Sequence, residues 1–124
     1  MPFLKWSWYV PFFQGFFLGI VAMVLHETSH VVTALALGVK VKRVGLDWKG
    51  LYTLREAGPP KENFVITLSG PLMNLLLTFS WQWLPTFALA NLCLAVCNLL
   101  PIKYSDGSRI LQLWQGYTRS TCDN

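Results

Sequence analysis

Both histidines of the chain lie in one five-residue segment, His26-Glu27-Thr28-Ser29-His30, which has the pattern HExxH. If this segment is helical, residues four apart share one face, so both imidazoles can reach a single zinc ion. The intervening glutamate then lies beside the metal without ligating it, where a carboxylate can accept a proton from water that the metal has acidified. The spacing therefore predicts a hydrolytic metal site with His26 and His30 as ligands and Glu27 as general base.

The ordinary interpretation of such a pattern is a chance match, because a lone helical histidine more often makes a structural hydrogen bond than binds a metal. Here, however, Glu27 is the only glutamate before position 56, and it lies in an otherwise apolar stretch that begins near Tyr9. An ionisable side chain inside a membrane costs at least about 2.5 to 3.5 kcal/mol on insertion scales. Its presence there indicates a function.

The composition places the chain in a membrane as one small domain, residues 1–124. Hydrophobic residues make up 53% of the 124 residues, charged residues make up 13%, and the mean hydropathy is +0.41. This is too apolar for the surface of a soluble domain of this size. The net charge of +4 could suggest nucleic acid, but membrane topology explains the basic residues better, so we expect no nucleic-acid partner. The three cysteines, an odd number without disulfide-type spacing, are interpreted as packing residues.

Three apolar segments, about residues 11–37, 64–84 and 86–100, predict three transmembrane helices. The first, which Pro11 can begin, exceeds the roughly 20 residues that span a bilayer core. No convincing cleavage site precedes His26, so we expect this helix to remain in the mature protein and to end near Gly38. The third segment measures only about 22 Å at the helical rise, which is short for a full crossing. We predict an α-helical membrane protein.

Residues 39–56 predict a short β-hairpin between the first two helices, at the membrane surface. Val39-Lys40-Val41-Lys42 alternates apolar and basic residues, and Leu51-Tyr52-Thr53-Leu54 resumes a strand-like pattern. The alternative is a solvated basic loop. Gly58-Pro59-Pro60 should then break the chain before the second helix.

Polar residues also occur in and after the later apolar segments. Asn74, in the second segment, should form a helix–helix hydrogen bond, with a role in the site as the alternative, and Gly70 permits close approach of a neighbouring helix. Pro101 ends the third helix while the chain is still below the membrane surface, and Asp106-Gly107 follows. A plain turn at the interface is the alternative there, but two histidines that need a third ligand favour Asp106.

The distribution of charge predicts the orientation. With three crossings, nine of the ten basic residues share one side, and Lys5 is alone on the other. The positive-inside rule then places the hairpin and the C-terminus in the cytoplasm and the N-terminus outside. Four tryptophans agree, since they fall on the outer side: Trp6, Trp8, Trp81 and Trp83. The tail, residues 108–124, has apolar spacings between positions 110 and 117 that suit a short interfacial helix.

These segments together resemble the site-2 protease family, the intramembrane zinc metalloproteases of peptidase family M50. The resemblance covers about residues 11–111 and rests on HETSH at 26–30, GPLMN at 70–74, and the pattern N-x-x-P-x-x-x-x-D-G at 98–107. It implies an endopeptidase with a membrane-protein substrate, in a multi-pass protein of the bacterial cytoplasmic membrane. It further implies the following roles: zinc bound by His26, His30 and Asp106, Glu27 as catalytic base, and Asn98 as a donor to the oxyanion. The hairpin would present an edge strand to an unwound substrate segment.

The chain departs from the family's usual pattern at Ser29, Ser105 and Ser108, none of which is a ligand or the base. It contains no flanking helices and no regulatory domain, so a homo-oligomer or a partner membrane protein could supply the missing walls. Two other functions remain open. One is a catalytically idle protein of the same fold that binds membrane segments without cutting them. The other is a small membrane protein whose His, Glu and Asp residues form a path for protons or metal ions.

Overall fold

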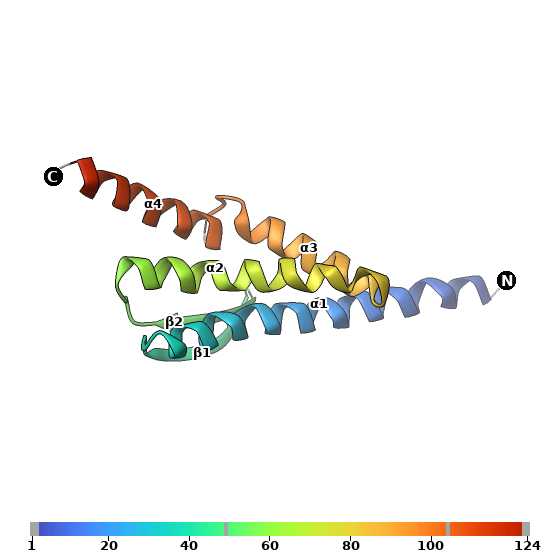
Figure 1. The fold of residues 1–124 in the computed structure, drawn as a ribbon. Coiled ribbons are helices and arrows are strands. Elements are labelled where there is room, and N and C mark those ends of the chain that lie inside the picture. Colours follow the sequence, from blue (N-terminus) through green and yellow to red (C-terminus); the bar gives the residue numbers. More distant parts are fainter. Residues whose placement is uncertain (1–2, 49, 104, 123–124) are drawn as a thin grey trace.

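The computed structural model describes residues 3–48, 50–103 and 105–122, which fold into helices that run lengthwise and a hairpin at one end (Figure 1). The elements are α1 (Phe3–Ala36), β1 (Val41–Asp47), β2 (Gly50–Arg55), α2 (Pro60–Leu77), the 3-10 helix η1 (Thr78–Gln82), α3 (Pro85–Leu99) and α4 (Asp106–Cys122). α1 and α2 lie side by side and run in opposite directions, and α3 packs against both. α4 contacts α2 and continues in the direction of α3 towards the hairpin end.

The first helix is longer than the sequence predicted. α1 begins at Phe3 and contains Pro11 in its interior, so the prediction that this proline begins the helix was wrong. Proline removes one backbone hydrogen bond, but residues 3–10 of the helix include no glycine and no other proline, so the helix continues through Pro11. The side chains of Trp6, Trp8 and Tyr9 lie outside those that the structure describes.

The first helix ends where the sequence predicted. Gly38 has φ +73°, its N–H bonds to the carbonyl of Leu35 at 3.1 Å, and the N–H of Val39 bonds to the carbonyl of Ala34 at 2.8 Å. This is the Schellman arrangement, in which a residue in the left-handed region satisfies the last carbonyls of a helix. It turns the chain directly into the hairpin.

The hairpin predicted for residues 39–56 is confirmed. β1 and β2 pair antiparallel from Val41 opposite Arg55 to Asp47 opposite Gly50, with an irregularity between Val41 and Arg43. Tyr52 lies across the sheet over Gly45, where an added Cβ would come within 2.6 Å of its hydroxyl oxygen. β2 packs against α1, which brings one strand of the hairpin beside the HExxH turn.

Two later boundaries differ from the prediction. α2 begins at Pro60, before the predicted position 64, because proline at the first turn of a helix lacks only an N–H that has no helical partner there. It ends at Leu77, and η1 carries the chain on to Gln82. The tail helix α4 begins at Asp106 rather than near residue 108, since the Ser105 hydroxyl accepts a hydrogen bond from the N–H of Ser108 at 3.2 Å and caps it.

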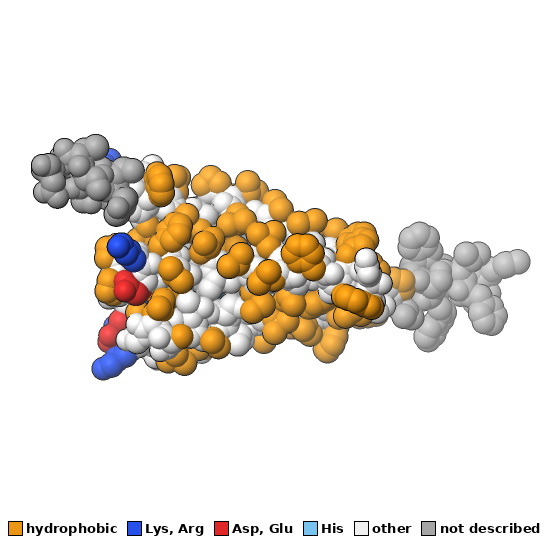
Figure 2. Space-filling view, in the orientation of Figure 1, with side chains coloured by type: hydrophobic (Ala, Val, Ile, Leu, Met, Phe, Trp, Pro, Cys, Tyr) orange, Lys and Arg blue, Asp and Glu red, His pale blue; other side chains and the backbone are white. Residues whose placement is uncertain are grey.

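The helices meet through small side chains and leave the large apolar ones outside. Ala22, Ala34, Ala88 and Ala95 are fully buried. Many large apolar residues are exposed, and Figure 2 shows them covering the helical body, with charged side chains gathered at the hairpin end. Two helical stretches, Pro11–Ala36 and Pro60–Gln82, are long and apolar enough to cross a membrane. α3 is apolar but shorter, so a third crossing stays a prediction.

Candidate metal centre

The three predicted ligands converge at one point between α1, α2 and α4. His26 and His30 are both buried, on the face of α1 that packs against α2, and their Nε2 atoms are 3.2 Å apart. Asp106, the first residue of α4, places Oδ2 2.9 Å from Nε2 of His26 and 3.2 Å from Nε2 of His30. His26 and Asp106 are 80 positions apart in the chain, yet the fold brings their donor atoms and that of His30 together at one point.

The spacing of these donor atoms fits a zinc ion. When nitrogen and oxygen ligands bind zinc tetrahedrally at 2.0 to 2.1 Å, neighbouring ligand atoms are roughly 3.3 Å apart. The Nδ1 atom of His30 donates to the carbonyl of Ile66 at 2.7 Å, so in the neutral ring Nε2 carries a lone pair. Nitrogen lone pairs and a carboxylate oxygen repel one another at such distances unless a cation or a proton lies between them.

The electrostatics of Asp106 suit a ligand. Burial raises the pKa of its carboxyl, but when the imidazoles carry a proton on Nε2, their hydrogen bonds and positive charge together outweigh burial and hold that pKa well below its usual range. The group is therefore ionised at neutral pH, which is the state that binds a metal. A side chain at Gly107 would collide with the backbone of Leu99 and Leu100, so this glycine allows α4 to begin against the end of α3.

Glu27 offers a second way to choose three ligands. Donor atoms of His26, Glu27 and His30 all lie within 4.8 Å of one another, whereas the set that contains Asp106 spans at most 3.2 Å. Oε2 of Glu27 also accepts a hydrogen bond from the Thr53 hydroxyl at 3.0 Å, which ties this carboxylate to β2. The geometry favours Asp106 as third ligand, with Glu27 beside the metal as a base. The roles of these residues stay a prediction.

α2 closes the other side of the centre. A Cβ at Gly70 would meet Nε2 of His30 at 2.5 Å and Nε2 of His26 at 2.7 Å, so α2 can approach the imidazoles only with glycine here. Asn74 is fully buried, with Nδ2 3.2 Å from Nδ1 of His26, while its Oδ1 has no hydrogen-bond partner among the described residues. Asn74 thus links the two helices, as the sequence predicted, but it does so through a predicted metal ligand.

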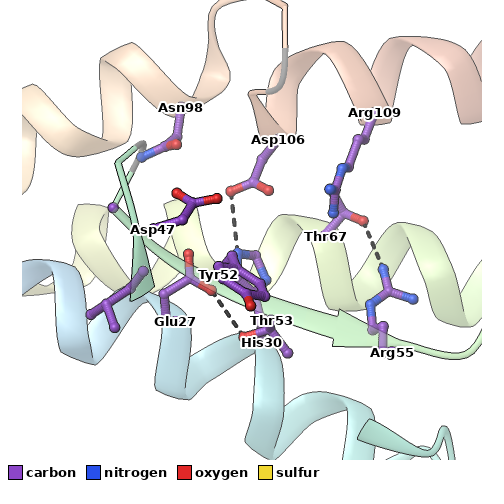
Figure 3. A pocket seen from close by; sticks show the side chains of 12 residues that line it. Glu27, His30, Asp47, Tyr52, Thr53, Arg55, Thr67, Asn98, Asp106 and Arg109 are labelled. Carbon is purple, nitrogen blue, oxygen red and sulfur yellow. Dashed lines mark hydrogen bonds and ion pairs between the residues drawn. The ribbon is translucent and has the colours of Figure 1, made fainter. Parts of the chain in front are cut away.

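A cavity of about 320 Å³ opens beside the donor atoms (Figure 3). Glu27, His30 and Asp106 form part of its wall, β2 forms another part, and Asn98 of α3 faces it. Nδ2 of Asn98 donates to the carbonyl of Leu94 at 2.9 Å within its own helix. One N–H of that amide is left for a ligand in the cavity, but the structure does not join Asn98 to the three donor atoms by a described hydrogen bond.

The sequence did not reveal three further residues of this cavity: Thr53, Arg55 and Arg109. Thr53 donates a hydrogen bond to Glu27, and the two arginines lie on the opposite side of the cavity from Asn98. Their positions depend on the hairpin register and on where α4 packs. The sequence contains one indication of Thr53 and Arg55: alternate residues of a strand, here 51, 53 and 55, share one face.

The fold and the site define a class: a helical protein whose apolar helices enclose an HExxH centre of metalloprotease type. Comparison with curated proteins gives the relationship. The chain is 30% identical to Stage IV sporulation protein FB of Bacillus subtilis over 76% of its length, and 30% identical to zinc metalloprotease MJ0392 of Methanocaldococcus jannaschii over 86%. It is also 30% identical, over 76% of its length, to a Synechocystis protein with the provisional name zinc metalloprotease sll0528.

This chain is therefore a distant relative of the site-2 protease family, peptidase family M50, as its motifs predicted. It spans only about a third of the length of these relatives, 30% to 38% of each. No family model matches the chain.

Proposed function

We propose that this chain is a zinc-dependent endopeptidase that cuts a peptide bond in or near a membrane-spanning segment of its substrate. The observation that carries the proposal is the convergence of His26, His30 and Asp106 on one point beside Glu27. Two of the relatives carry names that say zinc metalloprotease, which supports both the metal and the reaction class.

The proposed location is a lipid bilayer. Apolar side chains such as Phe12, Phe16 and Phe79 are each more than 60% exposed, which water would not tolerate over so large a surface. We propose three crossings by α1, by α2 with η1, and by α3, with the hairpin and α4 on the cytoplasmic side. The charged end in Figure 2 supports this orientation, since basic residues favour the cytoplasmic face.

Each residue then has a chemical task. A zinc ion held by His26, His30 and Asp106 would supply Lewis acidity that makes a water acidic and polarises a carbonyl. Glu27 accepts the proton of the attacking water at its carboxylate and delivers it to the leaving amine. Thr53 keeps one carboxylate oxygen in place through its 3.0 Å hydrogen bond, and the remaining N–H of Asn98 donates to the oxygen on which charge develops.

The substrate must be extended to enter. A helical peptide shields its own peptide bonds, whereas an extended segment can add to the edge of a sheet through backbone hydrogen bonds. β2 pairs with β1 on one side, and among the described residues no strand pairs with its other edge. Residues of β2 line the cavity, so a strand added there would run past Glu27.

The first test is cleavage of a model transmembrane substrate in detergent by wild-type protein and by Glu27→Gln. We expect Glu27→Gln to lose cleavage by at least about a hundredfold, since a general base contributes 10²- to 10⁴-fold. Glu62→Gln, a matched change in the first turn of α2 outside the cavity, should cleave like wild type. Unchanged cleavage by Glu27→Gln would refute the assignment of the base.

Zinc per chain in the purified protein tests the metal site itself and needs no substrate. We expect about one zinc in wild type, in Glu27→Gln and in Asp47→Ala, and marked loss in Asp106→Ala. Asp47→Ala is the matched control because Asp47 lines the same cavity. Retention of zinc in Asp106→Ala with loss in Glu27→Gln would favour the alternative ligand set. Zinc without cleavage would indicate an idle protein.

A further inference from the structure

The cavity continues beyond the metal centre as a groove with an arginine pair at its far end. A second hollow of about 390 Å³ shares four lining residues with the first: Thr53, Arg55, Thr67 and Arg109. The two hollows are therefore neighbours, between β2, α2 and α4. Asp106 lies near the middle of the first hollow, and the two arginines lie on the opposite side of it from Asn98 (Figure 3).

Arg55 is held in a fixed position. One of its nitrogens donates to Oδ1 of Asn63 at 2.6 Å and another donates to the Thr67 hydroxyl at 3.2 Å. A guanidinium has five N–H donors, so three remain for a ligand. Asn63 is itself fixed, because its amide bonds to both the N–H and the carbonyl of Gly58. The strand end and the start of α2 thus preorganise this arginine.

Arg109, in the first turn of α4, points toward Arg55 across the groove (Figure 3). Burial and the nearby charge of Arg109 both lower the pKa of Arg55, and the carboxylate of Asp106 offsets part of that effect. Two neighbouring guanidinium groups repel each other unless an anion lies between them. If Asp106 binds zinc, its negative charge serves the metal, and the arginine pair is left to attract an anion from a ligand.

The register of β2 gives the position of that anion. Thr53 contacts Glu27, and Arg55 follows two residues later on the same face of the strand. Two residues of a strand span roughly 6.7 Å. A substrate strand added to β2 has the same repeat, so the side chain two residues from the scissile peptide reaches the arginine pair.

We propose that Arg55 and Arg109 form a carboxylate-binding subsite for an aspartate or glutamate side chain of the substrate, two residues from the bond that is cut. This inference rests on the proposed endopeptidase function. Paired N–H donors on guanidinium groups match the two oxygens of a carboxylate. A substrate carboxylate is favoured over a lipid phosphate because both arginines line the hollow that contains Glu27, whereas exposed hairpin residues such as Lys42 and Arg43 face outward.

Peptide hydroxamates test the subsite without turnover, because a hydroxamate binds zinc directly. Two series extend the peptide from either side of the hydroxamate, with Asp, Asn or Lys two residues away. Dissociation constants are measured by calorimetry in neutral detergent. We expect Asp to bind about tenfold more tightly than Asn in one series, since a hydrogen bond to a charged group is worth about that much.

Arg109→Glu is the informative variant. Arg109 is exposed and Arg55 supports the hairpin, so a change at Arg109 is the less disruptive one. Arg109→Glu should remove the preference for Asp and make Lys the better side chain, which a purely structural role of Arg109 would not do. Arg119→Glu, a charge reversal in the last turn of α4, should leave the preference for Asp unchanged.

The outcomes separate this proposal from the function on which it rests. If no hydroxamate binds wild type, the zinc endopeptidase proposal is wrong, and the subsite proposal, which depends on it, is wrong as well. If all hydroxamates bind tightly but Asp and Asn bind equally in both series, only the subsite is wrong. If added phosphatidylglycerol abolishes the preference for Asp while phosphatidylcholine does not, the arginines bind an anionic lipid headgroup and the subsite is again overturned.

Discussion

The proton positions on two imidazoles decide whether Nε2 of each can bind a metal. For His30 the carbonyl of Ile66 accepts from Nδ1, which leaves Nε2 with a lone pair. For His26 the neighbour of Nδ1 is the Asn74 amide, whose oxygen and nitrogen exchange places on rotation by 180°. Oδ1 has no partner among the described residues, so rotation breaks no hydrogen bond at that atom. With Oδ1 turned to His26, Nδ1 donates and Nε2 is free to bind zinc.

We therefore predict that Asn74→Leu weakens zinc binding about 10- to 100-fold, the usual effect of losing a partner that orients a ligand. Leucine has a similar size but offers no acceptor. Asn74→Asp keeps the acceptor oxygen and should bind zinc more tightly than Asn74→Leu does. Competition with a zinc indicator in detergent measures both affinities. Wild-type affinity in Asn74→Leu would show that the amide serves packing alone.

The sequence could predict residues whose relation is local, because HExxH sets His26, Glu27 and His30 by the geometry of one helical turn. Asp106 could be predicted from a motif and from the need for a third ligand. Thr53, Arg55 and Arg109 could not be predicted, since each enters the site through the register of β2 or the packing of α4. The contact of Asn74 with His26 likewise depends on how two helices are rotated against each other.

At the scale of the elements, the sequence predicted which helices and strands exist better than where they end. Pro11 and Pro60 show the reason. Proline suits the first turn of a helix and is tolerated in a long apolar helix, so the residue alone does not say which applies. The structure places Pro11 inside α1 and Pro60 at the start of α2, whereas the sequence predicted that Pro11 begins the first helix and that Pro60 lies in the break before the second. The end of α1 was predictable, because Gly38 adopts a backbone conformation that favours glycine.

The close approach of α2 to the histidines gives a prediction about Gly70. Gly70→Ala should reduce zinc from about one per chain to near none, because the new methyl group would lie where the two imidazoles meet. Overpacking of this kind also destabilises a fold by about 1 to 3 kcal/mol. The matched control is Gly19→Ala in α1, where an added Cβ meets nothing within 4 Å. Zinc content and thermal unfolding in detergent check both variants.

Full zinc content in Gly70→Ala would mean that α2 does not press on the imidazoles. The Gly19→Ala control should keep its zinc and gain stability of roughly 0.5 to 1 kcal/mol, since alanine is favoured over glycine within a helix. Loss of zinc in both variants would indicate a general effect on folding rather than contact at the centre.

For the whole molecule, the short third helix determines how deep the centre lies. α3 has 15 residues, about 22 Å of helix, and it ends at Leu99 well before a full crossing. Asp106 begins α4 seven positions later and joins histidines that lie within the apolar stretch Pro11–Ala36. The centre would therefore lie inside the bilayer but open toward the hairpin end, where the cavity lets polar groups of the substrate enter.

This arrangement predicts that the two ends of α2 lie on opposite sides of the membrane. Lys42→Cys in the hairpin and Gln82→Cys at the end of η1 are exposed, polar positions of matched kind, introduced after the native cysteines are replaced by serine. In bacterial spheroplasts, an impermeant maleimide should label Gln82→Cys directly and Lys42→Cys only after permeabilisation, because basic residues favour the cytoplasmic side. The reverse labelling pattern would mean that α2 and η1 do cross the bilayer, but in the opposite orientation.

Labelling of both cysteines from one side would show that α2 and η1 do not span the bilayer. The site would then lie at the membrane surface, where substrates need not be membrane segments.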